Sequence, residues 1–543
     1  MANQVAVQVV DATLATEAST VAAQLADEKV AARLTAQDPT LWGPAAEHEA
    51  SIRLSWTTLH ETSRPLLAEI DALRADLRAE GVTRVVLAGM GGSSLAPEVI
   101  SNTAGVPLIV LDTTDPAQVA DALAGDVSAS VLVVSSKSGS TMETDSHRRI
   151  FIDAFRKLGI DPASRIVAVT DPGSPLAELA VKEGYRKLFL ADPNVGGRYS
   201  ALTAFGLVPS GLAGADVAGL LDDAADAAKQ LAVDSADNPG LVLGGALGSA
   251  HGKGAEKVVL ADSGSGIKGF ADWAEQLIAE STGKDGTGLL PVAVESVQAP
   301  GFADAGFDAT PVVIGPASGN AKIATLGPLG GQMLLWEYAT AVAGKLLGIN
   351  PFDQPDVEAA KKAARALLDN PSGGTEAKPI AVDGPVEIYP SAGWLPEGVT
   401  TTTAAVRALL AAAPGLGYVA IQAYLDRLDD ASASTLRPEL ARRGGLQTTF
   451  GWGPRFLHST GQYHKGGHQN GVFLQLTGAV DADIQVPDRP YTLGTLQHAQ
   501  ALGDGQVLAE HGRPVLRLHL TDRAAGLVAV ARAIDAAIQE VQR

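Results

Sequence analysis

The sequence predicts an α/β protein with parallel sheets, and three observations lead to this fold class. Short apolar runs rich in β-branched residues recur along the chain, and segments long enough for helices separate them. Continuous apolar runs of this kind are typical of strands that helices cover on both faces of a parallel sheet. The chain has 543 residues, 46% of them hydrophobic, so we expect more than one domain.

The elements of the first half follow in order. Residues 1–75 are expected to form a helical segment, because their apolar residues recur at helical spacing. A first α/β domain is predicted at 76–225. Its strand candidates, which begin at residues 82, 106, 130, 165 and 185, are VTRVVLAGM, VPLIVLDTT, SVLVVSS, RIVAVTD and YRKLFLAD.

The second half repeats the alternation. A second α/β domain is predicted at 226–370, with strands KVVLAD, LLPVAVES and TPVVIGP and with helices after Gly330 and Gln354. Residues 371–399 are rich in Pro, Gly and acidic residues and are predicted to be a linker. A C-terminal α/β region follows at 400–543, with strands GYVAIQAYL, LQTTFGWG, GVFLQLTG and PVLRLHLT and a closing helix from Thr521.

Composition excludes several classes of function. The formal charge is −20, which disfavours nucleic acid and anionic lipid as partners. The chain has no Cys, so disulfides, thiolate zinc sites and cysteine nucleophiles are excluded. No apolar stretch is long enough to suggest a signal peptide or a membrane span, and we expect a cytoplasmic protein.

Two strand-to-helix turns in the first domain have the composition of phosphate sites. The first, GMGGSSLAPEVI, begins at Gly89, and the second, SSKSGSTMET, begins at Ser135. Free N–H groups at a helix N-terminus and nearby hydroxyls bind a phosphate dianion well, and both turns would lie at the same edge of one sheet. For either turn alone, the alternative is that Gly and Ser are ordinary turn residues and Lys137 is a surface charge. Together the two turns favour phosphate.

Three further segments carry candidate chemical groups. GGRYSALTAFGL contains Arg198 before an apolar helix, and EQLIAESTGKDGTG places Gln276 and Glu280 on one helix face. NPFDQPDVEAAKKAA places Gln354 and Lys361 two helical turns apart, again on one face. Taken singly, each charged residue could be an ordinary solvated or ion-paired side chain.

These motifs together resemble the phosphoglucose isomerases, which consist of two sugar-isomerase (SIS) domains of αβα sandwich type. The similarity covers about residues 80–370 and comprises five motifs in the order of the family. Two departures from the family pattern are Ser138, where Thr is usual, and Thr282, where Asn is usual. The five motifs are GMGGSS, SSKSGSTMET, VGGRYSA, QLIAESTGK and NPFDQPDVEAAK.

The resemblance implies a glucose-6-phosphate/fructose-6-phosphate isomerase of glycolysis and gluconeogenesis. Glu280 would be the base that moves a proton between C2 and C1, Arg198 would stabilise the cis-enediolate, and Lys361 would help to open the sugar ring. No metal and no other cofactor is expected, because Arg198 and Lys361 supply positive charge. The residues implied to hold the substrate are Gly92, Ser93, Ser136, Lys137, Ser138, Thr141, Gln276 and Gln354.

One departure concerns the histidine that the family commonly uses for ring opening. The family places it between the Glu motif and the Lys helix, but this chain has no His between Glu280 and His458. The candidates His458, His464 and His468 lie in FLHSTGQYHKGGHQNG, which is predicted to be a loop and is similar to sequence in transaldolase–isomerase fusion proteins. Surface histidines are the alternative, and the ring-opening residue is left unassigned.

Two other functions remain open at this stage. A dual phosphoglucose/phosphomannose isomerase would share these motifs, and so would a non-catalytic sugar-phosphate sensor. The partner expected in every case is a small sugar phosphate. The family also implies a homodimer.

Overall fold

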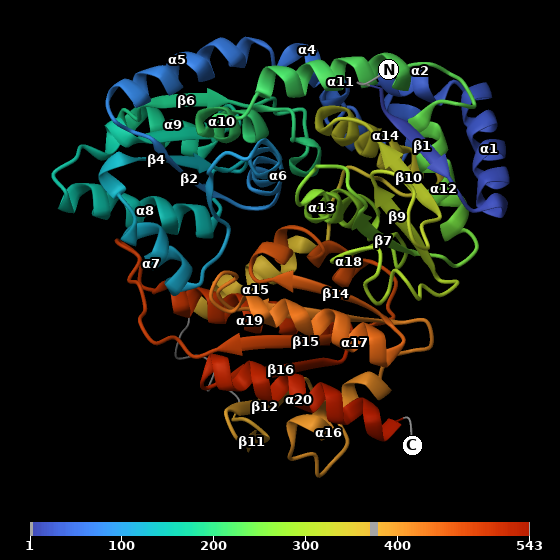
Figure 1. The fold of residues 1–543 in the computed structure, drawn as a ribbon. Coiled ribbons are helices and arrows are strands. Elements are labelled where there is room, and N and C mark those ends of the chain that lie inside the picture. The colour runs from blue at the N-terminus through green and yellow to red at the C-terminus, as the bar shows by residue number, and fades with distance from the viewer. Residues whose placement is uncertain (1–3, 370–377, 542–543) are drawn as a thin grey trace.

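The computed structural model describes residues 4–369 and 378–541, and it contains three sheets dominated by parallel pairing (Figure 1). This confirms the predicted α/β fold class. Figure 1 shows the first and second sheets side by side, with the third sheet packed below both. In the described ranges, no helix combines the length and the apolar character that crossing a bilayer requires.

The first sheet has five parallel strands in the order β3-β2-β4-β5-β6. Alternate residues of β2 face two different cores: Val85 and Leu87 belong to the large core shared with α6 and α10, and Val86 faces α7 and α8. The strands are β2 (Arg84–Gly89), β3 (Ile109–Leu111), β4 (Ser130–Ser135), β5 (Ile166–Thr170) and β6 (Lys187–Leu190). The helices are α6 (Leu95–Ala104), α7 (Pro116–Ala124), α8 (Met142–Lys157), α9 (Pro175–Glu183) and α10 (Ala204–Ala213).

Local sequence signals fix where these helices begin. Asp115 accepts a hydrogen bond from the backbone N–H of Ala117, and Pro116 occupies the first turn of α7. Ser174 caps α9 in the same way, again with a proline in the first turn. Thr141 precedes α8 without a side-chain cap, which leaves the first amides of α8 available to another acceptor.

The second sheet has the order β1-β10-β9-β7-β8, and only β1 runs antiparallel. The strands are β1 (Ala6–Val9), β7 (Lys257–Asp262), β8 (Leu290–Ala293), β9 (Ala309–Ile314) and β10 (Ile323–Leu326). The N-terminal helices are α1 (Ala12–Asp27), α2 (Val30–Thr35), α3 (Glu47–Ala50), α4 (Leu59–Thr62) and α5 (Pro65–Ala79). The later helices are α11 (Val217–Leu231), α12 (Pro239–His251), α13 (Phe270–Thr282), α14 (Leu329–Leu347) and α15 (Val357–Asp369).

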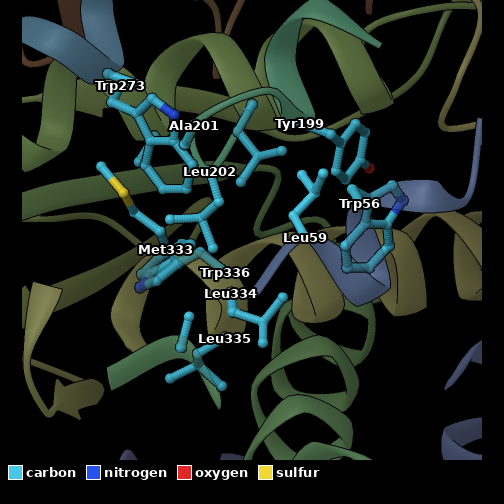
Figure 2. Packing of buried hydrophobic residues seen from close by; sticks show 14 of the residues in the cluster. Trp56, Leu59, Tyr199, Ala201, Leu202, Trp273, Met333, Leu334, Leu335 and Trp336 are labelled. Carbon is cyan, nitrogen blue, oxygen red and sulfur yellow. The ribbon is translucent and has the colours of Figure 1, made fainter. Parts of the chain in front are cut away.

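One apolar core runs from the first sheet to the second. Within it, Trp56 from the N-terminal segment stacks on Tyr199 with ring centroids 5.1 Å apart (Figure 2). Tyr199 directly follows Arg198, so this stacking anchors the turn that carries the arginine. Trp273 of α13 and Trp336 of α14 lie in the same cluster.

The third sheet has the order β11-β12-β16-β15-β13-β14, and its last four strands are parallel. Its strands are β11 (Ala381–Asp383), β12 (Val386–Pro390), β13 (Tyr418–Tyr424), β14 (Gln447–Trp452), β15 (Gly471–Gly478) and β16 (Val515–Leu520). Its helices are α16 (Thr402–Ala411), α17 (Leu436–Gly444), α18 (Gly461–Gly466), α19 (Leu493–Glu510) and α20 (Arg523–Val541).

Three segments differ from the expectation drawn from the sequence. The N-terminal segment 1–75 is not wholly helical, because β1 pairs with β10 at the edge of the second sheet. The predicted linker 371–399 contributes β11 and β12, which complete the third sheet through antiparallel pairing; its residues 371–377 lie outside the described ranges. The predicted loop at 456–471 contains the end of a 3₁₀ turn (Arg455–His458) and the helix α18.

Helix α15 also differs from its predicted place. The sequence assigns it to the second domain, but it packs along α19 of the third sheet, as Figure 1 shows. It has few large apolar side chains, and the buried ones, such as Val357 and Leu368, recur on one face. This packing brings α15 and the C-terminal region to the same side of the first sheet.

Candidate active site

A cavity of about 530 Å³ lies where the first sheet changes direction in its strand order. In the sheet, β2 lies between β3 and β4. The chain passes from β2 to its neighbour β3 on one side and then crosses to β4 on the other side, so the carboxyl ends of β2 and β4 form the switch point of the sheet. Ligands of open α/β sheets bind at this position. The two predicted phosphate turns follow these two strands, and both line the cavity.

The second turn presents hydroxyls and free amides to the cavity. Ser136 Oγ lies 2.9 Å from Thr141 Oγ1 and accepts a hydrogen bond of 3.1 Å from the Gly139 amide. The uncapped amides at the start of α8 follow directly. The turn therefore has the donors that a phosphate dianion needs.

Lys137 lines the same cavity, but its ammonium group already has a partner. Nζ lies 2.5 Å from Asp171 Oδ2 and 3.4 Å from the Pro193 carbonyl. Burial raises the pKa of Asp171, although Lys137 opposes the shift. A phosphate in the cavity would compete with Asp171 for this lysine.

The first turn is held against two other segments by glycines. A Cβ at Gly92 would lie only 1.9 Å from the Gly197 carbonyl oxygen, so the turn and the segment that carries Arg198 approach too closely for a side chain. Gly91 has a φ of +57°, and a Cβ there would lie 2.8 Å from both Gln276 Nε2 and the His458 carbonyl oxygen. Only glycine permits this packing.

Glu280 lies on α13 with its carboxylate facing the cavity and 9% of its side chain exposed. Its Oε1 lies 3.4 Å from Gln276 Nε2, and its Oε2 lies 3.5 Å from Arg198 Nε. Burial raises the pKa of Glu280, and the charge of Arg198 opposes the rise. A carboxylate in this environment is a stronger base than one in water.

Arg198 lies beside Glu280 without lining the cavity wall itself. Its Nη2 donates to the carbonyls of Phe352 and Asp353 and, at 2.8 Å, to Gln354 Oε1. Its Nε is buried and has no hydrogen-bond acceptor among the described residues. The guanidinium is thus fixed at one end and keeps one donor available near Glu280.

The segment before α15 contributes Gln354, and α15 contributes Lys361. Both line the cavity, and Lys361 Nζ lies 3.0 Å from Glu358 Oε1. Lys284 holds this segment in place, because its buried Nζ donates hydrogen bonds to the carbonyls of Asn350 and Asp353. Burial is the main cause that lowers the pKa of Lys284 to about 8.

The third sheet supplies one wall of the cavity. His458, from the 3₁₀ turn after β14, lines the cavity, and its Nε2 lies 3.0 Å from Glu143 Oε1. The same oxygen accepts a hydrogen bond of 2.7 Å from Gln500 Nε2 on α19. Although burial alone would raise the pKa of Glu143, the charge and hydrogen bond of His458 lower it to about 2.

The other two candidate histidines do not line the cavity. His464 is buried, stacks on Tyr418 and lies 3.1 Å from its hydroxyl. His468 is 54% exposed and pairs with Glu256 at 2.9 Å. Of the three, His458 is therefore placed to meet a ligand.

The structure brings the predicted site residues together. Arg198 contacts Glu280, and every other predicted residue lines the cavity: Gly92, Ser93, Ser136, Lys137, Ser138, Thr141, Gln276, Glu280, Gln354 and Lys361. Sequence reasoning left His458 unassigned and missed Glu143 and Gln500. Glu143 stands inside the quoted motif SSKSGSTMET, whereas nothing in the sequence marks Gln500.

The chain is similar in sequence to known proteins of one family. The model of the family described as phosphoglucose isomerase matches residues 65–294. A glucose-6-phosphate isomerase from Symbiobacterium thermophilum is 33% identical over 309 residues, which are 46% of this chain and 68% of the relative. A probable glucose-6-phosphate isomerase from Haloquadratum walsbyi is 29% identical over 53% of this chain and 80% of its own length.

Two solved structures are similar in fold. A hypothetical protein from Thermus thermophilus matches with a TM-score of 0.57 and 26% identity, over 67% of this chain and 99% of its own. A glucose-6-phosphate isomerase from Chlamydia trachomatis matches with a TM-score of 0.55 and 18% identity, over 69% of this chain and 90% of its own. From these matches and the ordered motifs around the cavity, we conclude that the chain belongs to the phosphoglucose isomerase family.

Proposed function

We propose that this enzyme interconverts glucose 6-phosphate and fructose 6-phosphate, with Glu280 as the base. Family membership supports sugar-phosphate isomerisation as the overall activity. The observation that carries the proposal is a single cavity of about 530 Å³ with a hydroxyl-lined turn at one side and a buried carboxylate at another. A phosphorylated sugar has the complementary groups.

The proton transfer uses groups already in contact. Glu280 takes the proton from C2 of the open aldose, the electron pair moves toward the C1 oxygen, and a cis-enediolate forms. The hydroxyl proton then passes from O2 to O1, the same carboxyl group returns its proton to C1, and the C2 carbonyl of the ketose forms. The Nε of Arg198, 3.5 Å from Glu280, favours both the ionised base and the negative charge that develops beside it.

The phosphate is held by the two turns at the switch point. Ser136 and Thr141 offer hydroxyls, the start of α8 offers amides, and Ser93 lies on the first turn. The phosphate does not react, so these contacts serve mainly to position the sugar carbons over Glu280.

We assign ring opening to His458, assisted by Lys361. Opening the pyranose requires a proton to leave the C1 hydroxyl and a proton to reach the ring oxygen. An imidazole in the wall can accept or donate that proton, and its hydrogen bond to Glu143 fixes the ring. In this arrangement the C-terminal region supplies part of the active site.

Replacing Glu280 tests the base. We expect Glu280→Gln to lose activity by about 10²-fold or more, since general-base catalysis contributes about that much. Binding of glucose 6-phosphate, measured by calorimetry, should persist. Glu275→Gln is the control on the same helix: burial raises the pKa of Glu275 to about 8, so an amide replaces a neutral group that does not line the cavity. Full turnover by Glu280→Gln would refute the proposal.

Chemical rescue tests His458. We expect His458→Ala to lose most activity and added imidazole to restore part of it, because the missing side chain leaves space in the cavity wall. His468→Ala is the control, since His468 lies in the same segment but outside the cavity. A loss that imidazole does not restore would indicate that His458 only supports the wall. The expected homodimer remains a prediction, to be measured by light scattering.

A further inference from the structure

Lys284 is a buried cation beside the isomerase cavity, and the proposed mechanism does not use it. It stands two residues after the end of α13, the helix that carries Glu280, and only 1% of its surface is exposed. It does not line the cavity. Its backbone pairs with Thr287 in a short bridge, so the side chain extends from a fixed point. A buried ammonium group needs acceptors, and the position of those acceptors indicates what it does.

All three ammonium hydrogens of Lys284 have acceptors in one short segment. Nζ lies 2.7 Å from the Asn350 carbonyl oxygen. It also lies 2.6 Å from the carbonyl oxygen of Asp353 and 2.7 Å from Oδ1 of the same residue. This segment joins α14 to α15 and continues into Gln354, which lines the cavity. Lys284 therefore ties the end of α13 to the segment that enters the cavity wall.

Arg198 is held by the same segment. Its Nη2 lies 3.1 Å from the carbonyl oxygen of Phe352 and 3.1 Å from that of Asp353. The Asp353 carbonyl thus accepts from Arg198 and from Lys284 at once. At its other end, Arg198 Nε lies 3.5 Å from Glu280 Oε2. These contacts form a closed ring that begins and ends on α13.

We propose that Lys284 is a positioning residue that fixes Arg198 at its distance from Glu280. The inference rests on the proposed roles of these two residues in proton transfer. An ammonium group suits this task, because charge-assisted hydrogen bonds are short and strong and hold their acceptors closely. Without the ammonium group the segment loses three contacts, and the guanidinium is no longer held beside the base.

The hold depends on the charge of Lys284. Burial, followed by the charge of Arg198, lowers the pKa of Lys284 to about 8, and the carboxylates of Asp353 and Glu280 oppose this shift. Helix α18 also packs against α13, and it presents the neutral amide of Gln462 there. A neutral amine has two hydrogens for three acceptors, so one contact is lost above this pKa. We therefore expect kcat/KM to fall as the pH rises through about 8.

Replacing Lys284 with methionine tests the hold, because methionine has a similar length and no charge. We expect Lys284→Met to lower kcat by about 10²-fold, since a displacement of about 1 Å at an active site can have that effect. KM should change less, because the phosphate turns are untouched. Lys257→Met is the matched control: Lys257 is also buried and lies 2.8 Å from Asp308 Oδ2, but it is at the start of β7 and outside the cavity. This control should lose stability without losing kcat.

The pH profile gives a second test that leaves Lys284 in place. Asp353→Asn removes a half-exposed carboxylate that raises the pKa of Lys284, so this variant should fold. The fall of kcat/KM at alkaline pH should then move from about 8 to a lower pH. In Lys284→Met the same fall should be absent.

Two results would overturn the inference. One is a kcat of Lys284→Met as high as that of Lys257→Met, and the other is a fall at alkaline pH that Asp353→Asn leaves in place. If Lys284→Met does not fold, the profile of Asp353→Asn decides. Glu280→Gln separates this inference from the proposed function: full turnover by that variant refutes the base, whereas an inactive Glu280→Gln beside a fully active Lys284→Met refutes the positioning role alone.

Discussion

The contact between Gly92 and Gly197 gives a sharp prediction, because it joins the phosphate turn to the segment that carries Arg198. In the Gly92→Ala variant the new Cβ would lie 1.9 Å from the Gly197 carbonyl oxygen, 2.6 Å from its carbonyl carbon and 3.0 Å from Ser200 Oγ. Real Cβ atoms essentially never approach other atoms within 3.0 Å. Backbone atoms cannot rotate away as a side chain can, so the two segments must separate by about 1 Å.

That separation has a predictable size of effect. A misplacement of about 1 Å at an active site can lower the rate by about 10²-fold. Overpacking of this kind also costs about 1–3 kcal/mol of stability. We therefore expect kcat/KM of Gly92→Ala to fall by about 10²-fold, with a lower melting temperature but a folded chain.

The assay follows fructose 6-phosphate conversion with a coupled dehydrogenase, and thermal unfolding is measured in parallel. Gly196→Ala is the matched control, because a Cβ there meets only Tyr199 Cδ2 at 4.0 Å. Its kinetics and melting temperature should stay close to those of the unchanged enzyme. If Gly92→Ala is as active and as stable as Gly196→Ala, the close approach of the two segments is wrong.

Three further predictions follow from other parts of the structure. Ser136→Ala removes a hydroxyl that we propose binds the phosphate, so KM should rise by about tenfold with a smaller change in kcat, as initial rates would show. An unchanged KM would contradict the phosphate assignment. Burial raises the pKa of Glu280 above its ordinary value of 4.5, and the proposed role as base requires the ionised form, so kcat/KM should fall as the pH decreases through that raised value. The Ki of an unreactive sugar phosphate across the same pH range separates this fall from titration of the phosphate. Glu337 is fully buried, neither of its carboxylate oxygens has a hydrogen-bond partner in the described part of the chain, and burial raises its pKa well above 4.5. Its folded form holds a proton that the unfolded chain releases above pH 4.5, so stability is lost as the pH rises beyond that point, by up to about 1.4 kcal/mol per pH unit. Glu337→Gln should remove this loss, and denaturant unfolding at pH 5 and pH 8 should show a gain that is larger at pH 8.

Much of the fold could be predicted because the central strands are buried on both faces. A strand such as SVLVVS must be continuously apolar, and that pattern is visible in one sequence. Strands without a buried residue carry no such signal. Strand β11 has no buried residue and β1 alternates between exposed and half-buried residues, so both escaped prediction.

The candidate site was predictable where local motifs carry it and unpredictable where tertiary packing does. Ser136 and Glu280 stand in local motifs that together carry the resemblance to the family. His458 and Gln500 reach the cavity because the third sheet docks on the first, through contacts between residues hundreds of positions apart, such as Arg455 with Glu98. Periodicity and spacing within a segment contain no information about such contacts.

The arrangement of this cavity also bears on how the enzyme matures as it is synthesised. The first two sheets share one core, so they can pack together while later segments are still being made. The wall formed by His458 and Gln500 can close only after β14 and α19 have left the ribosome. A nascent chain therefore holds Glu280 and the two proposed phosphate turns early but gains the complete cavity wall only near the end of translation.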